Sequence, residues 1–209
     1  MMKLEDLFQE YEKLVAKADQ AFGDIQKGYD SCIKCDIQCS DCCHSVFGLF
    51  LIESVYLNYQ MSKLDEKYGR EAALRGDKAD KDLQEIEKKL QTYDHNPQVK
   101  ALAMARERVR CPLLNDDQKC MLYSYRPITC RVYGVPTIIN GNVHACWKAG
   151  FEKGQAYPAF DLDGMYRELY KLSEKLLEIA GQKDMERASL LVSVSKSIKT
   201  PVIDLIGEI

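Results

Sequence analysis

The sequence predicts a mostly α fold: an irregular helical domain with one small β-hairpin, built around a cysteine-rich centre. In several segments apolar residues recur at intervals of three and four, which is typical of amphipathic helices. The pair Asn140-Gly141 lies between two short apolar runs and predicts a hairpin with a type I′ turn. Nine cysteines among 209 residues supply the centre. We expect a single domain, residues 1–209, with a core over residues 32–146 on which the terminal helices pack.

The first third of the chain is expected to hold two helices around a cysteine loop. Apolar residues from Leu4 to Ile25 form one stripe at helical spacing, and Gly28 is expected to end that helix. After the cysteine loop, residues 46–51 are compatible with a short buried strand or with the first turn of the next helix. That helix is expected over residues 53–64.

The middle of the chain is rich in charged residues. Residues 68–94 predict a solvated pair of helices that projects from the cysteine region, with a mobile point near Arg75-Gly76-Asp77. Asn96-Pro97 predicts the start of a helix over residues 97–109, because Asn is a good cap and Pro fits the first turn. Residues 115–117 predict a turn.

The last third is expected to contain three helices. Arg126-Pro127 opens a short helix that carries Cys130. Residues 161–180 and 184–198 then predict two amphipathic helices, separated by Gly181.

The cysteines fall into two groups that indicate chemistry. Five lie within residues 32–43 and four follow later in the chain. Short Cys-x2-Cys and Cys-x3-Cys spacings let neighbouring thiolates face one ion or cluster at a low entropic cost of loop closure. The alternative is a small buried side chain, which is reasonable for an isolated residue such as Cys146 but not for a cluster with so few apolar neighbours. The sequence therefore predicts a cysteine-rich metal centre.

All-thiolate ligation suits either an iron–sulfur cluster or Zn²⁺. Cys111-Pro112 favours an iron–sulfur cluster of the [4Fe–4S] type, because a cysteine before a proline also ends the ferredoxin run. Zinc remains the alternative, since four cysteines close one zinc site and eight close two. Arg126 and Arg131 are expected to lie close to the cofactor and to offset its negative charge, and Arg110 is a weaker candidate for the same role.

Two blocks of sequence, Cys35–Cys43 and Cys120–Tyr133, are joined by Cys111-Pro112 and followed by Cys146. In this order and spacing they resemble the YkgJ family of CxxCxxCC zinc- or iron-chelating proteins. The resemblance implies metal or iron–sulfur binding by eight cysteines: Cys35, Cys39, Cys42, Cys43, Cys111, Cys120, Cys130 and Cys146. Cys32 is extra to that pattern and is a less certain ligand.

Two enzyme families share part of this pattern. Flagellin lysine-N-methylases resemble the same domain and carry an iron–sulfur cluster, so the resemblance leaves a cluster-dependent enzyme open, with its catalytic residues unknown. The triplet Cys35-x3-Cys39-x2-Cys42 also matches the loop of radical S-adenosylmethionine enzymes. We do not favour that interpretation, because those enzymes resemble a β/α barrel and this chain shows no series of strand–helix units.

Composition narrows the classes of function, partner and location that remain. The net charge is −3 with acidic and basic residues interleaved, so we expect no nucleic-acid partner. We also expect no membrane segment and no export signal, and therefore a cytoplasmic protein whose thiols stay reduced. The expected function is cluster binding with a redox, electron-transfer or sensing role and a redox partner protein. A zinc-stabilised interaction module is the alternative, and the oligomeric state is open.

Overall fold

The computed structural model describes residues 3–36 and 39–207. Helices make up most of these residues, which confirms the mostly α class. The α-helices are α1 (Leu4–Tyr29), α2 (Leu51–Met61), α3 (Glu66–Leu90), α4 (Pro97–Met104), α5 (Ile128–Val132), α6 (Leu162–Ile179), α7 (Val194–Lys199) and α8 (Val202–Ile206). The strands are β1 (Thr137–Ile139), β2 (Asn142–His144) and β3 (Phe160–Asp161), and short 3₁₀ turns include η2 (Asp41–His44) and η5 (Met185–Ser189). No helix among the described residues has both the length and the apolar character to cross a bilayer.

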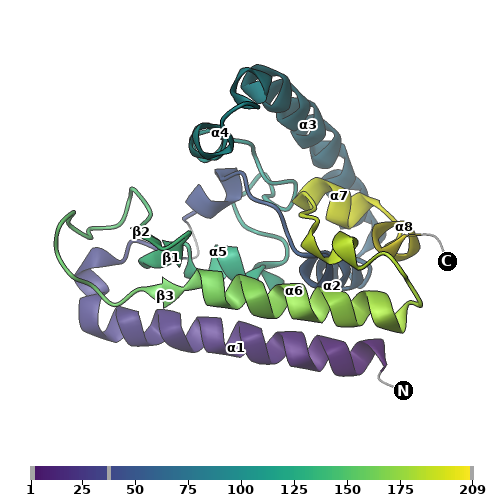
Figure 1. The fold of residues 1–209 in the computed structure, drawn as a ribbon, viewed down its shortest axis with the longest axis horizontal. Helices are drawn as coiled ribbons and strands as arrows, with labels where there is room; N and C mark the ends of the chain where they lie inside the picture. Colours follow the sequence, from purple (N-terminus) through teal and green to yellow (C-terminus); the bar gives the residue numbers. More distant parts are fainter. Residues whose placement is uncertain (1–2, 37–38, 208–209) are drawn as a thin grey trace.

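The long helices α1 and α6 lie side by side and run in opposite directions along one face of the molecule (Figure 1). Their apolar stripes meet α2 and α5 in the largest buried cluster, where Leu7, Tyr11 and Leu169 are almost completely buried. Burial of this amphipathic face stabilises α1 more than local propensity does. The helix also continues through Gly28 to Tyr29, so the prediction that Gly28 ends it is wrong.

The predicted hairpin is confirmed. β1 and β2 pair in antiparallel register, and Asn140 and Gly141 have φ angles of 51° and 71°, as a type I′ turn requires. Both turn amides donate to the Asp163 carboxylate, at 2.9 and 3.0 Å. A third strand, β3, pairs in parallel with the other edge of β1 and was not predicted.

Neither expectation for residues 46–51 holds in full. The segment forms no named strand, and α2 begins only at Leu51. Instead Leu49 and Val192 exchange two backbone hydrogen bonds of 2.8 and 2.9 Å. This contact holds residues 190–192 extended, so the predicted helix over residues 184–198 is also wrong: it is split into η5, the extended segment and α7. The short helix α8 that follows was not predicted.

The charged segment forms one continuous helix, α3, so the predicted pair of helices with a mobile point near Gly76 is wrong. At Gly76 α3 lies directly against α7, where the Ser195 hydroxyl donates to the Gly76 carbonyl at 3.0 Å. A Cβ atom at Gly76 would lie 2.8 Å from the Ser195 oxygen. The glycine therefore serves close packing between two helices and does not interrupt the chain.

Local signals gave the boundaries of two other helices. The Asn96 side chain accepts a hydrogen bond of 3.2 Å from the Val99 amide, and Pro97 occupies the first turn of α4, as predicted. The helix ends at Met104 and does not reach Val109. α6 begins and ends within one residue of its predicted limits.

We expect Gly76→Ala to destabilise the fold by about 1–3 kcal/mol, because its methyl group would push α3 away from α7. Gly69→Ala, on the same helix, is the matched control: no atom lies within 4 Å of its added Cβ. Because alanine favours helix more than glycine does, the control should gain roughly 0.5–1 kcal/mol. Urea unfolding of both variants measures the two free energies, and equal gains at both positions would contradict the close packing.

Candidate metal centre

A short backbone pairing brings the two cysteine groups together. The Cys111 amide donates to the Cys43 carbonyl at 2.7 Å, and the Val109 amide donates to the His44 carbonyl at 3.0 Å. Ser45 and Arg108 continue this pairing as an antiparallel bridge. The η2 turn that carries Cys42 and Cys43 is thus held directly against the chain that leads to Cys111.

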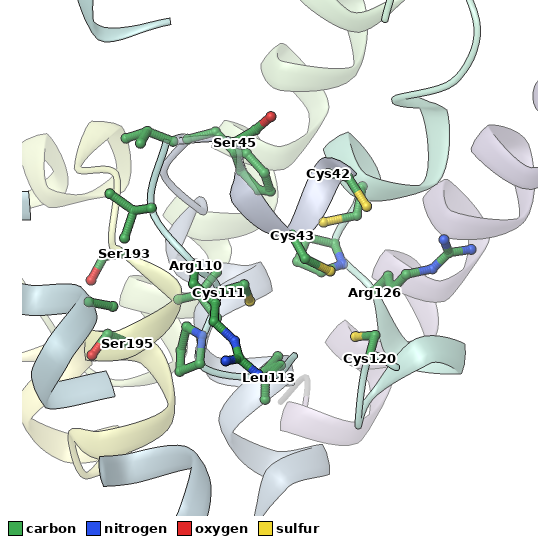
Figure 2. A pocket seen from close by; sticks show the side chains of 18 of the residues that line it. Cys42, Cys43, Ser45, Arg110, Cys111, Leu113, Cys120, Arg126, Ser193 and Ser195 are labelled. Atoms are coloured by element: carbon green, nitrogen blue, oxygen red, sulfur yellow. The ribbon is translucent and has the colours of Figure 1, made fainter. Parts of the chain in front are cut away.

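Five thiols from both groups line one cavity of about 60 Å³: Cys42, Cys43, Cys111, Cys120 and Cys130. Figure 2 shows Cys42, Cys43, Cys111 and Cys120 around this space. Cys120 is placed by a bridge to Leu114 across the predicted turn at residues 115–117. Cys130 lies on α5, the short helix that the sequence predicts after Arg126-Pro127.

The thiols are close enough to change one another's proton affinity. A hydrogen bond from Cys130, and a second from Cys43, lowers the pKa of Cys42 well below the usual value of a thiol. Hydrogen bonding to Cys120 and Cys42 correspondingly raises the pKa of Cys43. Burial raises the pKa of Cys111 to about 12. Several thiolates in so small a buried space would repel one another, so the arrangement suits an added cation that offsets their charge.

The other three predicted ligands do not line this cavity: they are Cys35, Cys39 and Cys146. Burial, and then the neighbouring Cys39, Cys42 and Cys146, raises the pKa of Cys35 to about 12. Gly134 faces the Cys35 sulfur so closely that a side chain at that position would collide with it. Cys39 also lines a small second hollow with Cys42, Cys43 and Cys120, so it lies next to the thiols of the cavity.

The two arginines that the sequence placed near the cofactor have different surroundings. Arg126 borders the cavity, stacks on the Tyr123 ring with its guanidinium carbon 3.7 Å from the ring centre, and lowers the pKa of Cys42 and Cys120 by its charge. Arg131 turns to α1, where it forms an ion pair of 2.7 Å with Asp19. Its other hydrogen bonds go to the Arg126 and Ser124 carbonyls. Arg131 therefore fixes the segment that carries Arg126.

Asp41 organises the centre and was not assigned a role from the sequence. It is only 5% exposed, and its carboxylate accepts hydrogen bonds from Arg108 at 2.9 Å and from the Trp147 indole at 3.2 Å. The Cys146 sulfur lies 3.7 Å away. Burial alone would raise the pKa of Asp41, but the Arg108 guanidinium and the Trp147 indole hold it below its usual value. The carboxylate thus ties the Cys146 loop to the first cysteine group.

The position of α5, and with it Cys130, depends on a buried glutamate. Glu53 is 3% exposed, and its carboxylate accepts hydrogen bonds from the Ile128 amide at 3.0 Å and the Phe50 amide at 3.3 Å. It therefore joins the start of α2 to the start of α5. Burial raises the pKa of Glu53 to about 7 despite these hydrogen bonds.

Helix α3 covers the cavity. Its Arg75 donates to the Pro112 carbonyl at 2.9 Å and contacts the Met121 sulfur at 3.0 Å, which fixes the loop between Cys111 and Cys120. Ala79 and Leu83 of the same helix line the cavity with apolar atoms. The charged segment expected to project from the centre therefore packs against it.

The donor set fits a metal that prefers thiolate ligands, because five cysteine sulfurs line the cavity and no carboxylate or imidazole is among its described lining residues. Within residues 3–36 and 39–207, no three histidine, cysteine, aspartate or glutamate side chains stand in positions that could hold a metal ion as they are. The thiols are gathered, and a metal would draw their side chains together by rotation about the Cα–Cβ bonds.

Residues 34–147 match the family described as "CxxCxxCC: Putative zinc- or iron-chelating domain". The match spans more than half of the chain. The chain belongs to this family. The matched range of the chelating domain contains all eight predicted ligands and leaves out Cys32, and the resemblance to the YkgJ-type cysteine-cluster family is confirmed. No curated protein and no solved structure gives a significant match.

We expect Glu53→Gln to remove the contribution of Glu53 to the pH dependence of the free energy of unfolding. The Glu53 pKa rises from 4.5 to about 7 on folding, so the folded protein binds this proton more tightly than the unfolded chain does. The proton therefore stabilises the native state fully below pH 4.5. That stability is lost as the pH rises to about 7, by roughly 3 kcal/mol. Urea unfolding across this range should show the fall in the natural protein and a flatter profile in the variant. Parallel profiles would contradict a buried, protonatable Glu53.

Proposed function

We propose that the chelating domain holds an iron–sulfur cluster of the [4Fe–4S] type in the cavity between η2, α5 and the loop from Cys111 to Cys120. The observation that carries this proposal is the presence of five thiols from both halves of the domain around one cavity. Iron–sulfur clusters are held by cysteine thiolates. When bound, such a cluster supplies one-electron transfer.

The size of the cavity supports a cluster over a single ion. A space of roughly 10–15 Å³ on the same measure accepts one water molecule. The cavity at the five thiols measures about 60 Å³ before any side chain moves, several times that amount. A zinc ion sits about 2.3 Å from each of four sulfurs, so a closed zinc site leaves no such space.

The residues around the thiols favour a buried, negatively charged cofactor. The Arg126 guanidinium supplies a fixed positive charge beside Cys42 and Cys120. Arg110 holds the loop that carries two ligands by donating to the Leu114 and Asn115 carbonyls. The apolar side chains of Val46, Ala79 and Leu83 exclude water, which raises the influence of these charges on a cluster's reduction potential.

We accordingly propose a redox role, in electron transfer or redox sensing, with a redox partner protein. The family's metal chelation supports this assignment, and thiolate ligation of a metal suits a cytoplasmic setting, where thiols stay reduced. Complete ligation by cysteine favours electron transfer over chemistry at an open metal position.

We expect anaerobically purified protein to be brown, with a broad visible absorption band and with iron and acid-labile sulfide in equal amounts. Cys130→Ser should lose most of this absorption, because Cys130 lines the cavity together with four other thiols. Cys32→Ser is the matched control and should keep it, because Cys32 lies outside the matched domain. Metal analysis and absorption spectra measure both variants. A colourless protein that contains zinc would overturn the cluster and establish the zinc-stabilised module.

A further inference from the structure

A second hollow, the anion cleft, lies beside the metal centre, and the predicted ligand Cys146 is one of the residues that line it. It measures about 620 Å³ and is lined by Ser45–Phe47, the Ala105–Arg108 segment, α5, the β1–β2 hairpin, Cys146-Trp147 and the start of α6. Binding sites for small molecules usually measure about 300–1,000 Å³. The cleft is therefore large enough for an organic ligand.

The charge of the cleft is positive. Arg106, Arg108 and His144 line it, and none of its lining residues is acidic. Arg108 is paired with Asp41 below the surface, but that carboxylate also faces Lys148 at 3.7 Å, so two cations oppose one anion. The Arg106 amide donates to the Ala103 carbonyl at 3.1 Å, but its guanidinium has no hydrogen-bond or ion-pair partner among the described residues. One guanidinium at the rim is thus free to bind an anion.

The walls of the cleft are apolar and aromatic. Phe47, Val132 and Leu162 contribute to its lining, together with the Tyr166 ring. Trp147 is 73% exposed, although the hydrogen bond from its indole nitrogen to Asp41 fixes its position. A fixed but exposed aromatic ring next to an unpaired guanidinium can contact both parts of an amphiphilic anion.

We propose that the anion cleft binds a small carboxylate that carries an aromatic ring, with the ring on the apolar walls beside Trp147 and the carboxylate on Arg106. A planar guanidinium matches a carboxylate with two parallel hydrogen bonds, which gives orientation as well as attraction. The proposed ligand is distinct from the metal. Arg106 and Trp147, which are expected to contact it, are not among the eight predicted metal ligands.

The single tryptophan of the chain makes the cleft observable. Metal-loaded protein is titrated with N-benzoyl-L-phenylalanine while Trp147 fluorescence is recorded, and the uncharged N-benzoyl-L-phenylalaninamide is the isosteric comparison. We expect a saturable change in fluorescence with the carboxylate and at least tenfold weaker binding of the amide. No saturable change with the carboxylate, or equal affinity for the two compounds, would overturn the proposal.

Arg106→Ala tests the residue assigned to the carboxylate. It should weaken binding of N-benzoyl-L-phenylalanine about tenfold and leave binding of the amide unchanged. Arg70→Ala on α3, which removes an exposed arginine outside the cleft, is the matched control and should bind like the natural protein. Unchanged affinity in Arg106→Ala would refute the role of Arg106. Metal content is measured in each variant, so a failure of ligand binding is separable from a failure of metal loading.

Discussion

The whole centre depends on the backbone pairing between Cys43–Ser45 and Arg108–Cys111. It closes a long stretch of chain with two hydrogen bonds, and the Asp41–Arg108 ion pair reinforces it from the side-chain face. A buried carboxylate without its partner is costly, so this ion pair penalises separation of the two segments more than a surface pair would. Folding brings the two segments together before a metal binds, so the entropic cost of closing this loop is not part of metal binding.

Features of the fold that are set by neighbouring residues were predictable, and those set by distant contacts were not. Asn96-Pro97 and Asn140-Gly141 act within four residues, so their helix start and hairpin follow from sequence. Gly76 suggested a break because a glycine in a charged segment usually weakens a helix. Its packing against α7 involves a residue more than a hundred positions away. The extended segment at Val192 likewise depends on pairing with Leu49, which no local pattern indicates.

The candidate site shows the same division. The cysteine spacings predict a thiolate centre because chelation needs donors of one kind close together, and the thiols do converge. The role of Asp41 depends on Arg108 and Trp147, which are near it only in the folded chain. The one local signal for it was an acidic residue directly before two predicted ligands. Arg131 also follows a ligand in sequence, yet the helical turn of α5 directs it to Asp19 on α1.

The cavity and the anion cleft share one wall. Ser45, Val46 and Phe47 line both spaces, so this segment lies between the five thiols of the cavity and an occupant of the cleft. Ser45 is held by Arg108 at 2.8 Å and by the Tyr133 hydroxyl at 2.5 Å, both of which also line the cleft. An anion that drew Arg108 away from Ser45 would release this wall. Ligand binding in the cleft and metal binding at the thiols would then be coupled, because both depend on the position of the Ser45–Phe47 segment. By thermodynamic linkage, each would change the affinity for the other by the same factor.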